Sequence, residues 1–143
     1  MTVDEILRSK GHEVVTIGPD ATLGEAVRLL DRHRIGTVVV LDGGRILALV
    51  SEQDVVRAIA RSGTDVLSKP LRSVMSKDVV TSSPDDRITT VMALMTHRRQ
   101  RHIPVVRDGE LVGIVSIGDL VKARLTELEL ESRVLRDAWL AAH

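Results

Sequence analysis

One sequence unit occurs twice in this chain, and this repetition constrains the fold more than any other feature. Residues 14–60 and 79–125 align without a gap at a constant offset of 65 positions (79 − 14 = 65). A unit this short rarely buries a sufficient hydrophobic core by itself. Two copies can pair about a pseudo-two-fold axis, which buries a shared face and leaves two equivalent clefts between the copies.

Composition narrows the class of protein. The 20 Lys and Arg residues balance the 20 Asp and Glu residues, so a global electrostatic grip on nucleic acid or on an anionic membrane is not expected. Cysteine is absent, which excludes disulfides and thiolate sites and is typical of intracellular proteins. The N-terminus has no run typical of a secretion signal, and no stretch approaches the roughly 20 apolar residues of a membrane helix. We therefore expect a cytoplasmic protein with no membrane or nucleic-acid partner.

Each copy predicts an extended lead, a helix, a β-hairpin and a second helix. In the first copy, Thr22 and Glu25 have the spacing of a capping box and predict a helix start. The β-branched run at 37–41 and the turn at 42–44 predict a hairpin, and residues 51–60 predict the second helix. The predicted fold class is α/β (α+β), with two pseudo-symmetric β-α-β-β-α repeats packed sheet to sheet and a long C-terminal helix.

The repeats also set the expected boundaries. Residues 1–65 form the first repeat, residues 66–125 the second, and residues 126–143 a helical extension. The segment 120–142 contains no Gly or Pro and reads as one long helix with an apolar stripe. The stripe contains Leu125, Leu128, Leu135 and Trp139. Such a helix either folds back on its own domain or packs against a partner subunit, and the second alternative implies a homodimer.

Three motifs recur in the same order in both copies. They are Val-Val-Thr-x-x-Pro-Asp at 14–20 and 79–85, Ile-Gly-Thr-Val-Val-Val at 35–40 with Arg-His-Ile-Pro-Val-Val at 101–106, and Leu-Val-Ser-Glu-Gln-Asp-Val-Val at 49–56 with Gly-Ile-Val-Ser-Ile-Gly-Asp-Leu-Val at 113–121. Over residues 1–125 this arrangement resembles a tandem pair of cystathionine-β-synthase (CBS) domains. The resemblance implies a pseudo-symmetric module that binds adenosine-containing ligands between its repeats, regulates an attached or partner protein, and often dimerises.

The Ser-x-x-Asp element after each hairpin has chemistry that suits a nucleotide. A helix N-terminus favours a phosphate, a Ser hydroxyl adds a donor, and an Asp three residues later can accept hydrogen bonds from two ribose hydroxyls. The resemblance implies that Ser51 and Ser116 face phosphate and that Asp54 and Asp119 hold ribose. The same spacing is also a variant capping box that satisfies a helix without any ligand, and both roles can hold at one site.

The two elements differ between their shared ends. In the first copy, Glu52 puts a negative charge beside the expected phosphate. In the second copy, Gly118 allows a closer backbone approach. We therefore expect two clefts of unequal affinity, with the cleft of Ser116 and Asp119 filled first.

With this resemblance, the adenine ring is expected against strand backbone and aliphatic side chains, since the chain contains no Phe or Tyr. Ordinary burial in a strand is the alternative for the same residues. The residues expected to form the two adenine pockets are Thr16, Ile17, Gly36, Thr37 and Val38 in the first copy, and Thr81, Ser82, His102, Ile103 and Pro104 in the second.

A basic run at residues 97–102, which includes Arg101, closes the first predicted helix of the second copy. Its cations have three interpretations. They stabilise the helix C-terminus, they bind a nucleotide with more than one phosphate, or they form a nucleic-acid patch, which the lack of interleaved aromatic residues disfavours. His97 and His102 lie across a helix end, which argues against a metal site.

These features favour a stand-alone regulatory module over an enzyme, since the chain has no nucleophile-elbow, phosphate-loop or zinc-protease motif. We expect no required cofactor. AMP or ATP is the favoured ligand, with ADP, NAD and S-adenosylmethionine as further candidates. With no effector domain in this sequence, an unknown effector protein would receive the signal in trans. A ligand-free structural dimerisation module is the alternative, and a nucleotide hydrolase is a more distant one.

Overall fold

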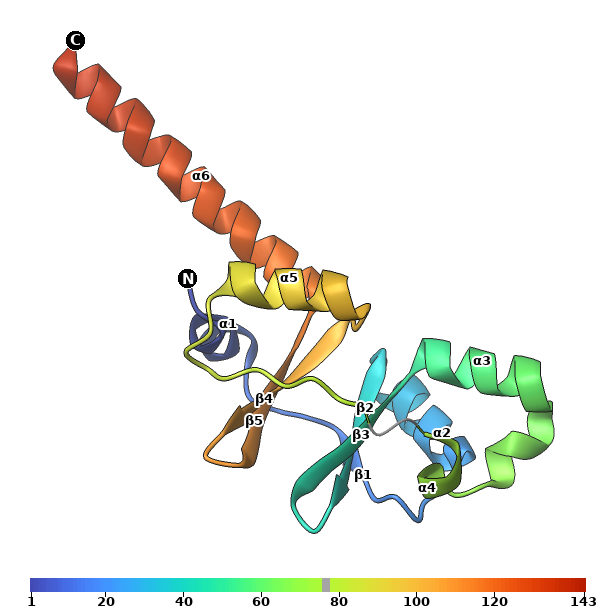
Figure 1. The fold of residues 1–143 in the computed structure, drawn as a ribbon. Coiled ribbons are helices and arrows are strands. Elements are labelled where there is room, and N and C mark those ends of the chain that lie inside the picture. The colour runs from blue at the N-terminus through green and yellow to red at the C-terminus, as the bar shows by residue number, and fades with distance from the viewer. Residues whose placement is uncertain (76–77) are drawn as a thin grey trace.

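The computed structural model describes residues 1–75 and 78–143, and it shows two repeats side by side with one long helix projecting from them (Figure 1). The elements in chain order are α1 (Val3–Lys10), β1 (Thr16–Ile17), α2 (Leu23–His33), β2 (Thr37–Asp42), β3 (Arg45–Ser51), α3 (Glu52–Ser62), the 3-10 helix η1 (Thr64–Ser68), α4 (Leu71–Val74), α5 (Ile88–Arg98), β4 (His102–Arg107), β5 (Glu110–Ser116) and α6 (Ile117–Ala142). The strands form two small sheets, and β3 of one sheet contacts β5 of the other. This arrangement confirms the predicted fold class.

The first repeat begins its elements where the sequence predicts. Thr22 Oγ1 accepts a hydrogen bond from the Glu25 N–H at 3.1 Å, and the Glu25 carboxylate accepts one from the Thr22 N–H at 2.9 Å. The predicted capping box at the start of α2 is therefore confirmed. β1 pairs in parallel with β2, which pairs antiparallel with β3. The hairpin turn uses Gly43 and Gly44, both with positive φ, a conformation that glycine adopts without strain.

The second repeat differs in its lead, and Pro104 explains the difference. In the first repeat, the Val39 N–H donates to the Val15 carbonyl at 3.1 Å, which ties the lead to β2. The equivalent position in β4 is Pro104 (39 + 65 = 104), which has no N–H to donate. The bond that holds β1 in place is therefore unavailable to the second lead.

The side chain of Gln100 takes over part of this role. Gln100 accepts a hydrogen bond from the Val80 N–H at 3.3 Å and donates one to the Val80 carbonyl at 2.9 Å. The second lead then reaches β4 through an isolated bridge between Ser82 and Val105. The first strand predicted for the second repeat is thus shortened to this bridge, and β4 and β5 form a two-stranded sheet.

The two lead helices exchange places between the repeats. α1 precedes the first copy, yet the N–H groups of Val3 and Asp4 donate to the carbonyls of Asp86 and Pro84 in the second copy, at 2.9 Å each. The apolar face of α1 completes the core of that second copy. This core contains Val3, Ile6, Leu7, Ile88, Val91, Met95, Ile103, Val105, Val115 and Leu120.

α4 makes the corresponding contacts in the opposite direction. It precedes the second copy, yet the Leu71 N–H donates to the Ala21 carbonyl at 2.8 Å and the Arg72 N–H donates to the Pro19 carbonyl at 2.9 Å. The buried Leu71 joins the core of the first copy. This core contains Leu23, Ala26, Leu30, Val38, Val40, Ala48, Val50, Val55, Val66 and Leu71. Each core is therefore built from both halves of the chain.

α6 leaves the repeats after about three turns, since Ala123 packs against the second core and Glu127 pairs with the N-terminal amine at 2.8 Å. Leu120 is fully buried, but the later turns of the helix extend away from both repeats (Figure 1). Its apolar stripe is exposed, by 56% at Leu125 and 71% at Leu135. The helix does not fold back on its own domain, so that alternative for the stripe is wrong.

Leu7→Ala tests whether the first lead stabilises the second repeat. Leu7 is fully buried in the second core. We expect its truncation to lower the free energy of unfolding by about 2–5 kcal/mol, because apolar contacts are lost and a cavity remains. Denaturant unfolding measures the loss. Leu130→Ala is the control, since Leu130 is 59% exposed on α6 and should change stability by less than about 0.5 kcal/mol. Equal effects of both substitutions would contradict the exchange of leads.

Candidate functional site

The two repeats meet at a pair of equivalent residues, Thr37 and His102 (102 − 37 = 65). They begin β2 and β4, and Thr37 Oγ1 shares a hydrogen bond with His102 Nδ1 at 3.2 Å. An added Cβ at Gly36 would lie 3.3 Å from His102 Cε1, so the glycine lets the imidazole approach the first repeat closely. Because the contact joins equivalent positions, the pseudo-two-fold axis passes near it.

The environment of His102 keeps its imidazole neutral at neutral pH. Burial lowers the pKa of His102 below its ordinary value of 6.5, and the charges of Lys10 and Arg101 act in the same direction. Asp119 and Glu52 oppose this decrease without reversing it. The pKa of His102 therefore depends on charged groups from both repeats.

The first cleft, which we call the Asp54 cleft, lies between the start of α3 and the end of α5 and contains a cavity of about 270 Å³. Ser51 Oγ accepts a hydrogen bond from the Asp54 N–H at 3.2 Å, and Asp54 Oδ2 accepts from the Ser51 N–H at 2.9 Å and from the Ser51 hydroxyl at 2.8 Å. The element is thus a complete capping box, with the Asp54 side chain still exposed. The predicted site residues that line this cavity are Gly36, Thr37, Ser51, Asp54, Arg101 and His102.

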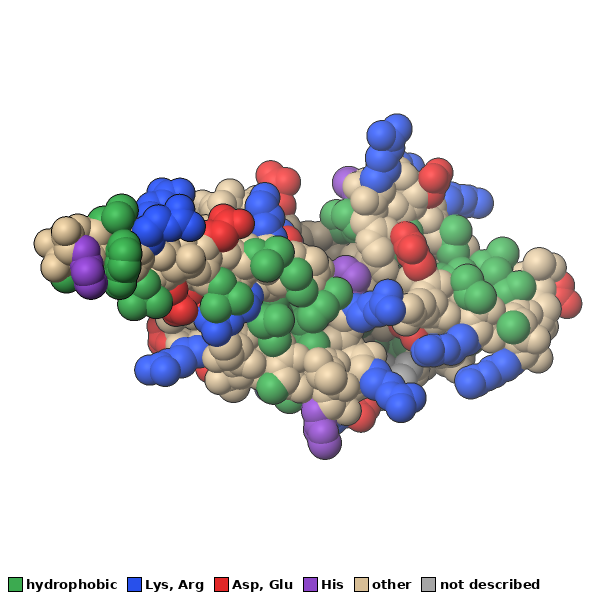
Figure 2. All heavy atoms as spheres, turned by 90° about the horizontal axis from the view of Figure 1, so that it is seen from above, with side chains coloured by type: hydrophobic (Ala, Val, Ile, Leu, Met, Phe, Trp, Pro, Cys, Tyr) green, Lys and Arg blue, Asp and Glu red, His purple; other side chains and the backbone are tan. Residues whose placement is uncertain are grey.

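Four arginines line the same cavity, namely Arg57 on α3 and Arg98, Arg99 and Arg101 around the end of α5. Lys and Arg side chains gather at this junction of the repeats (Figure 2). Arg98 pairs with Asp78 at 2.9 Å. Within the described residues, the other three arginines form no ion pair. Three acidic residues also line the cavity, so its formal charge is +1 (4 − 3 = 1).

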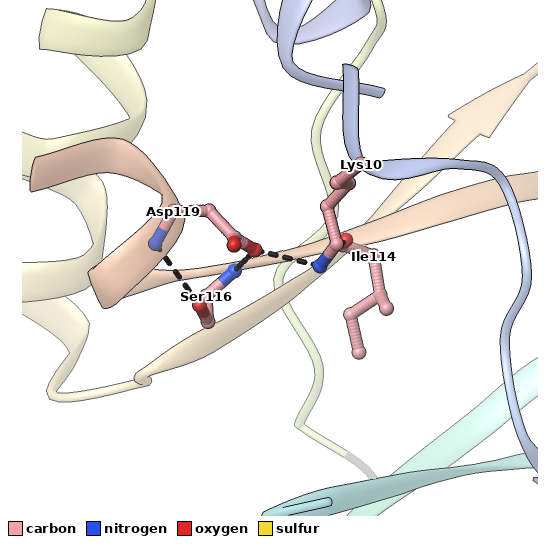
Figure 3. Close-up of polar contacts among 4 residues, drawn as sticks. All are labelled: Lys10, Ile114, Ser116 and Asp119. Carbon is pink, nitrogen blue, oxygen red and sulfur yellow. Dashed lines mark hydrogen bonds and ion pairs between the residues drawn. The ribbon is translucent and has the colours of Figure 1, made fainter. Parts of the chain in front are cut away.

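The cleft predicted for the second repeat, which we call the Asp119 cleft, is placed by its Ser-x-x-Asp element at the start of α6, and this element has the same capping geometry. Ser116 Oγ accepts a hydrogen bond from the Asp119 N–H at 3.1 Å, and Asp119 Oδ2 accepts from the Ser116 N–H at 2.8 Å. Here a cation is already present. Lys10, at the end of α1, donates from Nζ to Asp119 Oδ2 at 2.6 Å and to the Ile114 carbonyl at 3.0 Å (Figure 3).

The two aspartates are therefore in different electrostatic states. Burial by itself would raise the pKa of Asp119, but the hydrogen bonds from Lys10 and from the Ser116 N–H, together with the charge of Lys10, lower it below its ordinary value of 3.8. Asp119 is an ionised carboxylate in an internal ion pair. Within residues 1–75 and 78–143, no cation pairs with Asp54.

The other residues predicted for the adenine pockets do not line the Asp54 cavity. Thr16 is exposed and lines a separate cavity beside the hairpin turns, and Thr81 is also exposed. Ser82 is buried, and its hydroxyl donates to Asp86 Oδ2 at 2.9 Å. The remaining residues have side chains that are buried or half-buried in strands, and they are Ile17, Val38, Ile103 and Pro104.

Among the cleft residues that sequence reasoning missed, two are cations that bear on the chemistry of the aspartates, Lys10 and Arg57. Lys10 is 109 positions from Asp119, and only the exchange of leads brings the two together, so no local pattern indicated the contact. Arg57 follows Asp54 by three positions on α3, a spacing that places both on one helix face and could have indicated it.

Residues 1–75 and 78–143 lack the features of two other kinds of site. This part of the chain contains no group of three or more His, Cys, Asp or Glu residues arranged to hold a metal ion. Its helices include none with the length and apolar character needed to span a membrane. The clefts are therefore the candidate sites that the described structure offers.

The fold and the Asp54 cleft define the class of protein, a tandem α/β repeat module with a cleft at its pseudo-two-fold interface. The family model for the CBS domain matches residues 3–61 and 71–126. The chain belongs to the CBS domain family, as its motifs predicted.

Individual relatives agree with this assignment. The crystal structure of a CBS-domain containing protein from Agrobacterium tumefaciens is 43% identical, covers 87% of this chain and 99% of that one, and superposes with a TM-score of 0.83. A CBS domain protein from Pyrobaculum aerophilum, complexed with AMP, is 30% identical over 92% of this chain and 99% of that one, with a TM-score of 0.78. The mitochondrial CBS domain-containing protein CBSX3 of Arabidopsis thaliana is 33% identical over 88% of this chain and 66% of that protein. The chain thus spans just under two thirds of the Arabidopsis relative.

The state of His102 predicts a pH dependence of stability. Its folded pKa lies below the unfolded value of about 6.5, so the unfolded chain binds the proton first as pH falls. The contribution is fully present above about pH 6.5 and is lost as pH falls toward the folded pKa. We expect His102→Gln to lose less unfolding free energy than the wild type between about pH 7 and about pH 5. Denaturant unfolding at each pH measures this, with the exposed His97→Gln as control. An unchanged slope in His102→Gln would contradict the burial of a neutral imidazole.

Proposed function

We propose that this chain is a regulatory CBS module that binds an adenosine-containing ligand between its repeats. The observation that carries the proposal is the Asp54 cleft, where an exposed carboxylate at a helix start shares one cavity with cationic side chains. The relative from Pyrobaculum aerophilum that is complexed with AMP supports this class of ligand. AMP or ATP is the proposed ligand.

In this proposal, Asp54 holds the ribose. Ser51 engages its Oδ2, whereas Oδ1 takes part in no hydrogen bond within the described residues. Two vicinal hydroxyls can donate to a carboxylate in charge-assisted hydrogen bonds. Gly36, Leu49 and Val79 line the same cavity and offer backbone and aliphatic surface to a purine.

Arg57, Arg99 and Arg101 suit the phosphates. Guanidinium groups bind phosphate oxygens in pairs of parallel hydrogen bonds, and the N-terminus of α3 contributes its positive dipole end. Glu52 lines the cavity as well and opposes this attraction. Asp54 is assigned to the ribose, and Asp78 pairs with Arg98. Glu52 is then the remaining carboxylate that opposes the three other arginines, so we expect phosphorylated nucleosides to bind more tightly than adenosine.

The proposed output is regulatory and lies in trans. Ligand binding shifts the relative orientation of the repeats only through different affinities for two arrangements. α6 extends away from the repeats and exposes hydrophobic side chains (Figure 2). A second copy that covers this apolar stripe would make a homodimer. We propose a cytoplasmic, non-catalytic role that requires no cofactor, with an effector protein still to be identified. The proposed repeats are residues 1–65 and 66–125, and the extension is residues 126–143.

A second candidate is a structural dimerisation module without a ligand. Both Ser-x-x-Asp elements complete their own helix caps, and Asp119 already has a cationic partner. The exposed stripe on α6 serves this function equally well. The two candidates differ in whether nucleotides change the stability of the protein.

Asp54→Asn tests the proposed ligand site. Asparagine still caps a helix, but it loses the charge that strengthens hydrogen bonds from ribose, so we expect the affinity for AMP and ATP to fall about 10- to 100-fold. Calorimetric titration with adenosine, AMP, ADP, ATP, NAD and S-adenosylmethionine measures this. Asp137→Asn, far along α6, is the matched control and should bind as the wild type does. No binding of any of these compounds by the wild type at millimolar concentration would favour the ligand-free module.

Leu135→Glu tests the proposed dimer. Leu135 is 71% exposed on the stripe, and a charge there would be buried by a second copy. We expect the dimer dissociation constant to rise at least about tenfold, as measured by analytical ultracentrifugation. Leu130→Glu is the control, because Leu130 is 59% exposed and lies on the opposite side of α6. A dimer that tolerates Leu135→Glu as well as Leu130→Glu would show that the stripe is not the interface.

A further inference from the structure

We propose that Lys10 is an internal competitor for the Asp119 cleft and that it makes the Asp54 cleft fill first. This inference rests on the proposed function, because it takes Asp119 to be a ribose-binding carboxylate. Lys10 Nζ lies 2.6 Å from Asp119 Oδ2 and 3.0 Å from the Ile114 carbonyl oxygen (Figure 3). Asp119 Oδ1, like Asp54 Oδ1, takes part in no hydrogen bond within the described residues, so Lys10 competes with a ribose by binding Oδ2 and neutralising the carboxylate.

The chain around Lys10 is anchored, so the contact is part of the fold. Gly11 ends α1 with a φ of 104°, and its N–H donates to the Leu7 carbonyl at 2.8 Å. His12 follows, and its Nδ1 shares a hydrogen bond with the Val112 carbonyl at 3.0 Å. Residues 10–12 thus lie along the edge of β5 that faces away from β4, where their side chains engage the carbonyls of Val112 and Ile114.

The approach of α1 to β5 also has its own adaptation in the sequence. An added Cβ at Gly113 would lie 2.7 Å from the Leu7 side chain, so this glycine lets α1 pack on β5. The first repeat has the buried Ala48 at the equivalent position (113 − 65 = 48). Gly113 is therefore explained by the docking of α1, the same docking that delivers Lys10 to Asp119.

The two clefts present different obstacles to a nucleoside. At Asp119 the ion pair is partly shielded from solvent, with side chains that are 35% exposed for Lys10 and 25% for Asp119. A ribose there has to compete with the ammonium for the charge of the carboxylate, whereas no cation within the described residues pairs with Asp54. The Asp54 cleft is then filled first. This order is the reverse of the one expected from Gly118, where an added Cβ would meet Ser116 Oγ at 3.7 Å, an ordinary van der Waals contact.

Adenosine is the probe for this inference, because it carries the ribose but no phosphate. Loss of a lysine therefore cannot be mistaken for loss of a phosphate contact. In the Asp54→Asn background, the backbone amide of Asp119 reports binding to the second cleft in an NMR titration. We expect the added Lys10→Met substitution to lower the dissociation constant there by about threefold or more, the scale of a partly shielded ion pair. The exposed Lys69→Met is the matched control and should leave it unchanged.

A second variant and the remaining outcomes complete the test. Lys10→Gln keeps a donor for the Ile114 carbonyl but has no charge, so it should reproduce the gain if Lys10→Met fails to fold. An unchanged or weaker affinity for adenosine in these variants overturns the inference. If the wild type binds adenosine at the Asp54 cleft but substitution of Lys10 does not change the affinity of the Asp119 cleft, this inference is overturned and the proposed function stands. No binding of adenosine, AMP or ATP to the wild type and every variant overturns the proposed function, and the inference with it.

Discussion

The exchange of the two lead helices is the constraint on which the rest of the structure depends. A hairpin with two flanking helices is too small to bury an adequate core alone, and here each core takes its missing helix from the other half of the chain. The Val3 N–H donates to the Asp86 carbonyl, and the Leu71 N–H donates to the Ala21 carbonyl. The two acceptors are equivalent positions of the repeats, and the two bonds cross between the halves in opposite directions. Each core contains residues of both halves, so the interface between the repeats is fixed by two crossings of the backbone as well as by surface contacts.

Single residues then break the symmetry of this duplicated frame. Pro104 cannot donate the bond that holds β1 in the first repeat, and Gln100 satisfies the second lead instead. Gly113 lets α1 approach β5 closely, whereas the first repeat has a buried alanine at that position. Lys10 arrives with α1 and neutralises Asp119. A faithful repeat of the backbone therefore produces two clefts with unlike electrostatics.

The sequence was a good guide to features that depend on neighbours along the chain. Capping boxes and the hairpin turn follow from residues at most a few positions apart, and the structure has them where they were expected, as at Thr22 and Glu25. The resemblance to CBS domains, which the family match confirms, rested on ordered motifs of this kind. The shortened first strand of the second repeat had a visible cause in Pro104, but its consequence required the partner bond of Val39 to be known.

Features that depend on residues far apart in the chain could not be predicted from the sequence. The leads were assigned to the copies that they precede, and no periodicity within a helix indicates which of two similar cores it enters. Of the residues expected to bind a nucleotide, the structure gathers those at the start of β2 and α3 around the Asp54 cavity and places others, such as Val38, in the core. The contact of Lys10 with Asp119 follows from the exchange alone.

The position of this contact bears on how a signal can leave the module. Lys10 ends α1, Asp119 lies in the first turn of α6, and α1 and α6 are in contact. A ligand that displaces Lys10 acts directly on the helix that projects from the repeats. An ion pair of this exposure is worth about 1 kcal/mol or less, whereas a nearly complete switch between two states needs about 5.5 kcal/mol. Lys10 can therefore adjust the order of binding, but a full conformational switch has to draw on larger contacts, of the size that a second copy covering the stripe of α6 would supply.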